Sequence, residues 1–298
     1  MIYVRAFLIA FLLVVNAFPG FCQDTEIDDE NFVFSVKQID EFMERFNRDK
    51  NTFLITYLNR KFPGQQAEKT DRYRYVINLF NTKNTFWDTT LVKEFAKEVT
   101  DTVHPIYINY SDNDWYALLQ CKVLYKKRIR NLDLVLKTER AQNNSSKWVI
   151  VSAKADFLKF KSSYDSTKAP LPVYCGTDLR DSALENKYFL NPMAHGTDFM
   201  SVEEAFDTNG QFKNYLYAGL ISEQINLLMQ ALKKHNLVFK YVTRVSYHFL
   251  QVPGWLFICE NFNRNSHNSG WLISNLYKVN EIQKKIYLQQ YLNVPRND

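Results

Sequence analysis

Glycine and proline are scarce in this sequence, with eight of each among 298 residues. Disordered chains and flexible linkers are usually rich in these residues, and the chain has no low-complexity tract. It carries instead 18 tyrosines and 23 phenylalanines, and 46% of its residues are hydrophobic. This length and composition predict two ordinary cores built on sheets with large aromatic faces.

Concentrated charge is also missing. The 37 Lys and Arg residues exceed the 32 Asp and Glu residues by five, and by four once Arg5 is removed with a leader. Proteins that bind nucleic acid usually present a strong basic field on one surface. The sequence therefore predicts no nucleic-acid partner.

The motifs of several common enzyme classes are absent. The sequence contains no GxSxG, HExxH, GxGxxG, P-loop or EF-hand pattern, and its cysteines form no CxxC or Cys/His cluster. We therefore assign no catalytic residue, metal or cofactor from motifs.

The one unbroken apolar run, residues 6–15, is too short to span a membrane. It contains ten residues, whereas a membrane helix needs about 20. Arg5 precedes the run and Pro19-Gly20 follows it, which is the pattern of a secretory signal peptide. Residues 1–22 are expected to be removed, so that the mature chain begins at Gln23, has no membrane span and lies in the periplasm or outside the cell.

Alternatives remain for this leader. Val15 and Ala17 offer an earlier cleavage site, and the run is also compatible with an N-terminal core helix. A lipid anchor at Cys22 is not expected, because Phe21 stands where lipid-attachment signals have a small residue.

One stretch of the chain occurs twice. Trp148-Val149-Ile150 and Trp271-Leu272-Ile273 share a pattern at an offset of 271 − 148 = 123 residues, and the flanking residues 115–152 and 238–274 both read as antiparallel meanders. A repeat of this period is the size of a domain. We predict two tandem domains, residues 23–165 and 166–298, with a boundary in the Ser-, Lys- and Pro-containing residues 159–172.

Three cysteines remain after the leader: Cys121, Cys175 and Cys259. An odd number permits one disulfide at most in an oxidising compartment. The alternative is that all three are small, buried, apolar residues.

Helices are expected around both meanders. Ser35 and Gln38 suggest a capping box for an amphipathic helix over residues 35–47, and Asn280 with Gln283 suggests another for a closing helix. Further helical segments are predicted at residues 91–99, 201–206 and 218–234, a strand at 106–110, and short apolar segments at 53–58 and 73–80.

The first strand of the two copies differs in an informative way. The odd positions from Trp115 to Tyr125 are all apolar, whereas the 123-residue offset places Lys240, Arg244 and His248 at equivalent positions. Because strand side chains alternate with period two, a one-residue slip or a bulge would restore the match.

The pattern of early helices followed by long strands ending in W-[VL]-I resembles the nuclear transport factor 2-like (cystatin-like) superfamily. The segments FMERFN (42–47), HGTDFM (195–200) and YHFLQVPGWLFICE (247–260) are similar to a group of secreted bacterial proteins without a known activity. The resemblance implies an α+β fold of two tandem cone-like domains, each a curved antiparallel sheet on N-terminal helices, with a pocket in the mouth. The superfamily includes isomerases, cyclases and dehydratases as well as non-catalytic binding or dimerising modules, so the fold alone does not decide function.

Lys240, Arg244 and His248 are the first candidate ligand-binding residues. Their four-residue spacing places them on one strand face, where they suit an anionic or polar ligand. The alternative is an ordinary solvated sheet face.

Two other groups deserve weighing. His195 and Asp198 are three apart in a loop and form either an acid–base pair in a ligand site or part of a helix start. The tryptophans either stack sugar rings or pack in the core, and the basic residues 126–130 form either a patch or a charged hairpin end that discourages edge pairing. The tryptophan set is Trp115, Trp148, Trp255 and Trp271.

The leading functional hypothesis is a non-catalytic secreted or periplasmic protein that binds a small molecule or a protein partner. An isomerase- or dehydratase-like enzyme is the first alternative and requires a carboxylate or His inside the cone beside a Tyr or a second acid. A structural subunit of an envelope assembly is the second, and a homodimer through sheet faces is compatible with either non-catalytic role.

Overall fold

The computed structural model describes most of the chain from residue 35 onward. The residues described are 35–36, 38–48, 72–140, 146–159, 189–190, 199, 201–207, 211–265 and 268–295. The predicted leader, the apolar segment 53–58 and the boundary segment 160–172 lie outside these residues.

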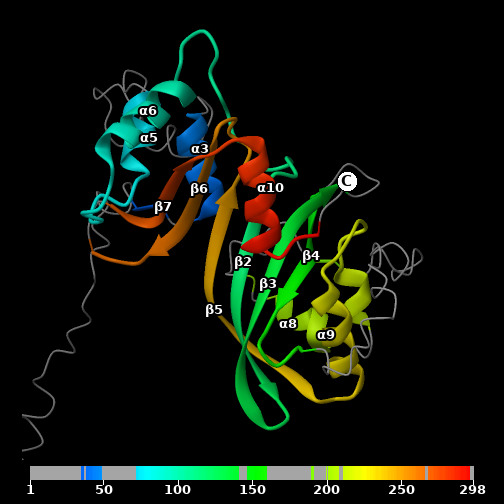
Figure 1. The fold of residues 1–298 in the computed structure, drawn as a ribbon. Helices are drawn as coiled ribbons and strands as arrows, with labels where there is room; N and C mark the ends of the chain where they lie inside the picture. The colour runs from blue at the N-terminus through cyan, green and yellow to red at the C-terminus, as the bar shows by residue number, and fades with distance from the viewer. Residues whose placement is uncertain are drawn as a thin grey trace, which may run out of the picture.

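Helices and strands alternate in blocks along the chain (Figure 1). In chain order the elements are β1 (Ser35–Val36), α3 (Ile39–Asn47), α5 (Arg72–Asn78), α6 (Thr89–Val99), β2 (Trp115–Tyr125), β3 (Arg128–Arg140), β4 (Ser146–Lys154), α8 (Val202–Asp207), the 3-10 helix η4 (Gln211–Tyr215), α9 (Glu223–Lys233), β5 (Leu237–Phe249), β6 (Trp255–Phe262), β7 (Ser269–Lys278) and α10 (Glu281–Gln290).

The strands form a single seven-stranded sheet in the order β1-β7-β6-β5-β2-β3-β4. The meanders β2–β4 and β5–β7 are each antiparallel, and they are joined because β2 pairs with β5. The short β1 adds to β7 in parallel. The fold is therefore α+β with an open, mainly antiparallel sheet. None of the described helices is both long enough and apolar enough to cross a membrane.

The predicted repeat is confirmed in the strand pairing. Leu136 pairs with Ile150 and Cys259 with Ile273, and both members of the second pair are 123 residues beyond those of the first. The bulge is repeated as well: the register shifts just before each of these pairs, which leaves Val151 and Ser274 as the extra residues. Trp148 and Trp271 lie at equivalent positions and are both buried, as predicted.

The first strands of the two meanders follow a different offset. Tyr116 pairs with Lys137 and Ser246 with Glu260. Lys137 and Glu260 are 123 residues apart, whereas Tyr116 and Ser246 are 246 − 116 = 130 residues apart. The second copy thus has seven additional residues between equivalent points of these strands. Since seven is odd, the strict offset exchanges the two faces. The expected one-residue slip was too small.

The helices do not pack on the meander that follows them in the sequence. Phe80 forms a bridge with Ile273 of β7, and Leu216 forms the same parallel bridge with Ile150 of β4. The next backbone N–H donates to the strand in both cases, from Asn81 to Ile273 O (3.0 Å) and from Tyr217 to Ile150 O (2.9 Å). The N-terminal helices therefore cover the second meander, and the middle helices cover the first.

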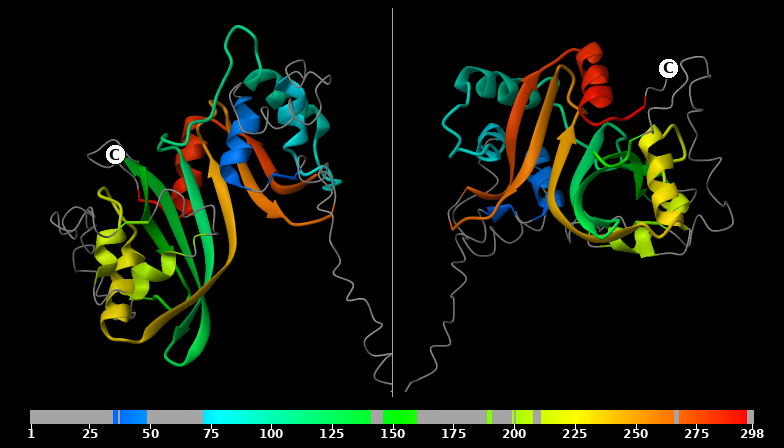
Figure 2. Two further views of the ribbon diagram at one scale, coloured as in Figure 1. Left: turned by 180° about the vertical axis from the view of Figure 1, so that it is seen from behind. Right: turned by 60° about the horizontal axis from the view of Figure 1, so that its bottom comes forward.

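This crossed packing makes the two packed halves of the molecule nested. Residues 115–233 supply β2–β4 with α8, η4 and α9, while residues on either side supply α3–α6 and β5–β7. Figure 2 shows the strands β2–β4 curling around α8 and α9, with α3–α6 grouped at the other end of the sheet. The expected division into two consecutive domains near residue 165 is not confirmed.

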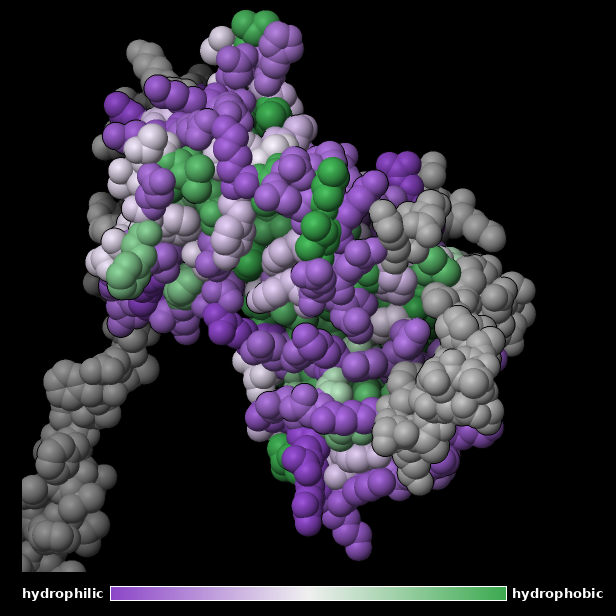
Figure 3. Space-filling view, in the orientation of Figure 1, coloured by the Kyte–Doolittle hydropathy of each residue, from purple (hydrophilic) through white to green (hydrophobic). Residues whose placement is uncertain are grey.

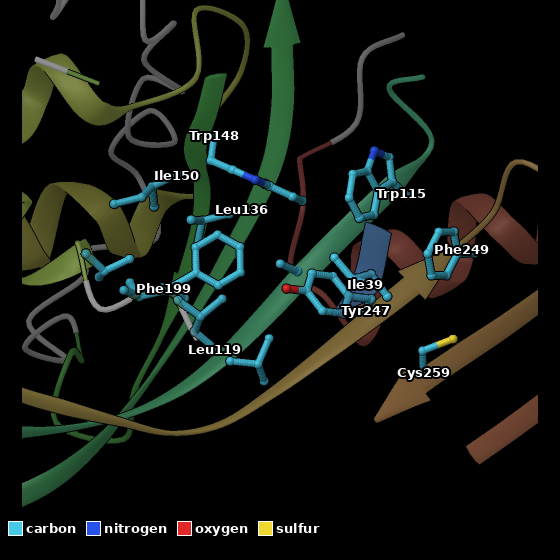
Figure 4. Close-up of a cluster of buried hydrophobic side chains, with 14 of the residues drawn as sticks. Ile39, Trp115, Leu119, Leu136, Trp148, Ile150, Phe199, Tyr247, Phe249 and Cys259 are labelled. Carbon is cyan, nitrogen blue, oxygen red and sulfur yellow. The ribbon is translucent and has the colours of Figure 1, made fainter. Parts of the chain in front are cut away.

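The inner face of the sheet, on which α3–α6 and α8–α9 pack, carries a continuous aromatic core (Figure 4). Trp115 lies 4.7 Å from Trp148 and 5.5 Å from Phe249 between ring centroids, and Phe249 stacks on Phe257 at 4.8 Å. The four tryptophans weighed as sugar-stacking residues are at most 2% exposed, so they pack in the core. Aromatic side chains fill the space that a cone-shaped fold would use as a pocket.

The outer face of the sheet is covered in part by α10, which crosses in front of the strands in Figure 1. Its predicted capping box is confirmed: Asn280 accepts from Gln283 N and Gln283 Oε1 accepts from Asn280 N. The box predicted at Ser35 and Gln38 is wrong, because Ser35 pairs in β1 and α3 begins after Gln38 without a side-chain cap. Residues 106–110 are not a strand, and the helix predicted from residue 218 begins at Glu223.

Candidate functional site

His248 is buried on the outer face beneath α10, with 1% of its surface exposed. Its Nε2 lies 2.9 Å from Ser246 Oγ, and its Nδ1 lies 2.6 Å from Tyr287 Oη. Tyr287 in turn stacks on Tyr291, with ring centroids 4.9 Å apart. Both ring nitrogens thus have partners in the protein, so His248 connects the strand to the closing helix.

Burial of His248 lowers its pKa from 6.5 to about 3. The charged imidazolium loses its hydration in this site, and the two hydroxyl partners are neutral. The ring is therefore neutral near pH 7. A Ser–His pair at this distance resembles part of a nucleophilic site, but Ser246 is only 7% exposed and α10 covers the pair. This geometry supports a structural role for His248.

Arg244 lies on the same face and points to a protein partner. Its Nη2 is 2.5 Å from Glu260 Oε1 on β6, and 58% of the Arg244 side chain is exposed. The ion pair leaves the guanidinium accessible to solvent. Whether Arg244 and His248 bind a ligand stays a prediction.

Lys240 is out of phase with these two residues because β5 contains two irregularities. Gln120 pairs with Arg244 but Cys121 pairs with Val242, and Lys122 pairs with Tyr241 but Val123 with Phe239. Two residues, one of them Lys240, are therefore extra in β5. The prediction that strict alternation places Lys240, Arg244 and His248 on one face is wrong, since each extra residue reverses the alternation.

The remaining candidates divide between described and undescribed residues. His195, Asp198 and Cys175 lie outside the described residues, so their predicted roles stay predictions. Cys121 and Cys259 are free and buried, and burial raises the pKa of both thiols. These two cysteines are thus uncharged and inert packing residues near neutral pH.

The inner face offers little acid–base chemistry within the described part of the chain. The buried polar residues found there include no Asp or Glu, and the one buried His is on the outer face. The same residues contain no group of three or more His, Cys, Asp or Glu placed to hold a metal ion. The carboxylate or His that an isomerase-like site requires inside the cone is therefore not among the described buried residues.

The β2–β3 hairpin ends in an unusual turn. Tyr125 pairs with Arg128, so Lys126 and Lys127 are the two turn residues, and both have positive φ, 47° and 65°. Two-residue hairpin turns of this kind favour Asn-Gly, because other side chains cost about 1–2 kcal/mol each in the left-handed region. Retention of a costly conformation at an exposed position is a feature of functional sites.

A second basic segment lies beside this turn. The backbone N–H of Lys126 donates to Asn236 O at 2.9 Å, which brings the corner between α9 and β5 against the hairpin. We refer to residues 122–131 and 233–241 together as the basic tip. The basic tip contains eight Lys and Arg residues and no Asp or Glu. They are Lys122, Lys126, Lys127, Arg128, Arg130, Lys233, Lys234 and Lys240.

A pocket of about 420 Å³ opens at the edge of the basic tip. Lys122, Ile129, Arg130 and Asn131 line one side, and Asp156 and Phe157 line the other. Lys122 Nζ donates to Asn131 Oδ1 at 2.7 Å, which holds the ammonium at the pocket wall. Figure 3 shows hydrophilic side chains gathered at the lower end of the molecule, where the hairpin turns, with hydrophobic surface among them.

Sequence reasoning noticed part of the basic tip but not the whole. The run at residues 126–130 was visible, and a charged hairpin end explained it. The contribution of residues 233–241 depends on the pairing of β2 with β5, which local patterns do not reveal. Comparison of the chain with family models, curated proteins and solved structures finds no match.

Proposed function

We propose that this protein is a non-catalytic binding protein and that the basic tip with its adjoining pocket is its binding site for an anionic ligand. One observation carries the proposal. Without the eight tip cations the chain has 37 − 8 = 29 basic residues against 32 acidic ones, a balance of −3. The positive charge of the whole chain is thus concentrated at one end of the sheet, where it favours approach of an anion.

The pocket adds the geometry that a binding site needs. Lys122 and Arg130 both line it, and a guanidinium beside an ammonium suits a phosphate or carboxylate group. Asp156 on the opposite wall favours a ligand that also carries a donor. Arg130 and the turn residues are exposed, so a ligand reaches them without displacement of any element.

The proposal includes the setting expected from the sequence. We propose that residues 1–22 are a signal peptide, that the mature chain works in the periplasm or outside the cell, and that its two halves are related units of the nuclear transport factor 2-like kind. The repeated register of the meanders and the helices on the inner face support the last point. The crossed packing would make such a pair an intertwined duplication.

A phosphate titration tests the binding site. Inorganic phosphate is added to the ¹⁵N-labelled mature protein, and amide shifts are followed by NMR. We expect saturable shifts at residues lining the pocket, and at least a tenfold weaker response in the variant Lys122→Gln/Arg130→Gln, because two charge-assisted contacts are lost. Lys97→Gln/Lys285→Gln is the matched control, since it removes two exposed cations elsewhere. Equal titrations of the control and the tip variant would refute the site.

A further inference from the structure

We propose that the basic tip docks on the surface of an anionic phospholipid bilayer. This inference rests on the proposed anion-binding function and assigns the source of the anion: lipid headgroups. Its support comes from side chains of the tip that a soluble anion does not require. These are exposed apolar residues placed among the cations.

The apolar residues form a row across three strands. Leu124 of β2 pairs with Ile129 of β3 on one side and with Val238 of β5 on the other. Directly paired residues point to the same face of a sheet, so the three side chains are neighbours. Ile129 is 57% exposed and Val238 is 47% exposed. The row therefore presents aliphatic surface to solvent at the end of the molecule.

The next row on the same face is polar and aromatic. Lys122 of β2 pairs with Asn131 of β3 and with Tyr241 of β5. Tyr241 is 59% exposed, and its ring stands beside a cation in sequence, Lys240. Tyrosine is favoured at the boundary between lipid headgroups and acyl chains, because it combines an apolar ring with a polar tip.

The turn supplies cations in front of these rows. Lys126, Lys127 and Arg128 are all exposed at the end of the hairpin, and the pairing of Tyr125 with Arg128 holds the turn at the extremity of the two strands. Lysine and arginine beside an anionic leaflet each strengthen binding about fivefold. The shape fits a flat surface that accepts an apolar row and surrounds it with phosphates.

A bilayer explains these features better than the alternatives do. A nucleic acid rewards cations and flat stacking rings, but it gains little from aliphatic Ile129 and Val238. A small soluble phosphate uses the pocket and leaves the apolar row in water. Interfacial binding uses both the electrostatic attraction and the buried apolar area.

Vesicle co-sedimentation tests the inference. The mature protein is mixed with vesicles of phosphatidylcholine containing about 30% phosphatidylserine, or with pure phosphatidylcholine vesicles, at about 0.15 M salt. We expect binding to the anionic vesicles alone, and about a hundredfold or greater loss in Lys126→Gln/Lys127→Gln/Arg128→Gln/Arg130→Gln, from four cations at about fivefold each. Ile129→Ser/Val238→Ser keeps every charge and should weaken binding about tenfold or more, because the apolar row is lost.

Two measurements guard against misleading variants. Far- and near-UV circular dichroism establishes that each variant is folded, and the control Lys97→Gln/Lys285→Gln should bind as the unmodified protein does. In Ile129→Trp, quenching by brominated lipids should report contact with the acyl boundary without any loss of charge. Unchanged binding by Ile129→Ser/Val238→Ser together with no quenching would overturn the inference.

The outcomes also separate this inference from the proposed function. Saturable phosphate shifts at the pocket without binding to anionic vesicles would overturn the lipid inference and leave the anion site standing. Equal binding to neutral vesicles, or binding to a DNA duplex without binding to vesicles, would overturn it as well. Vesicle binding that survives removal of the tip cations would refute both.

Discussion

The burial of His248 predicts how the stability of the fold depends on pH. The ring is 1% exposed and is held between Ser246 and Tyr287, with Tyr291 5.8 Å away between ring centroids. Burial lowers the folded-state pKa from 6.5 to about 3. Acid therefore protonates His248 in the unfolded chain well before it protonates the ring in the folded protein.

The sign and size follow from proton linkage. Between about pH 6.5 and pH 3 the unfolded state binds a proton at His248 that the folded state does not, so unfolding becomes easier as the pH falls. The contribution of His248 is fully present above pH 6.5 and is lost at about 1.4 kcal/mol per pH unit below it. At pH 4.5 the loss is about 2–3 kcal/mol, a large part of the stability of an ordinary domain.

Urea unfolding at pH 7.5 and pH 4.5 measures this loss. In His248→Gln the free energy of unfolding should fall by about 2–3 kcal/mol less between the two pH values than in the unmodified protein, because glutamine does not titrate. Glutamine still offers a donor and an acceptor to Ser246 and Tyr287. His235→Gln is the matched control, because His235 is exposed. Identical pH dependence in the unmodified protein and His248→Gln would refute the argument.

Two further predictions concern the backbone and one cation. In Gly270→Ala, the new Cβ would lie 1.9 Å from Val36 O at a φ of +85°, so the free energy of urea unfolding should fall by about 3 kcal/mol or more; Gly254→Ala, with nothing within 4 Å at a φ of +76°, should cost only the strain of about 1–2 kcal/mol, and equal losses would contradict this account. Arg72 donates to the carbonyl oxygens of Phe46, Val99 and Ile106 at 2.9, 2.8 and 2.5 Å. Arg72→Lys should lower the melting temperature by a loss of about 3 kcal/mol, since one ammonium cannot serve all three carbonyls, and an unchanged melting temperature would argue against this role.

The meanders could be predicted from the sequence because their patterns are local. The alternation from Trp115 onward and the repeated W-[VL]-I pattern predicted strands, burial and even the shared register of β3–β4 and β6–β7. The capping box at Asn280 was predictable for the same reason. A cap depends on four consecutive residues, and a strand face depends on period two.

The pairing between distant segments could not be predicted in this way. Nothing local reveals that β2 pairs with β5, or that Phe80 bonds to β7 rather than to the equivalent position on β4. His248 was read as a polar group on an open face because the helix that covers it begins 33 residues later, at Glu281. The interpretation of Lys240 failed because a bulge leaves no sign in the alternation of neighbouring side chains.

The crossed packing of the helices sets a problem of timing during synthesis. Phe80 leaves the ribosome 273 − 80 = 193 residues before Ile273, its partner on β7. At typical elongation rates this interval lasts roughly 10–40 s. Throughout it, β4 is already made and presents Ile150, which has the same register and the same bonding groups as Ile273. The N-terminal segment thus meets a close copy of its partner first, and the arrival of residues 211–217 must displace it before the final sheet forms.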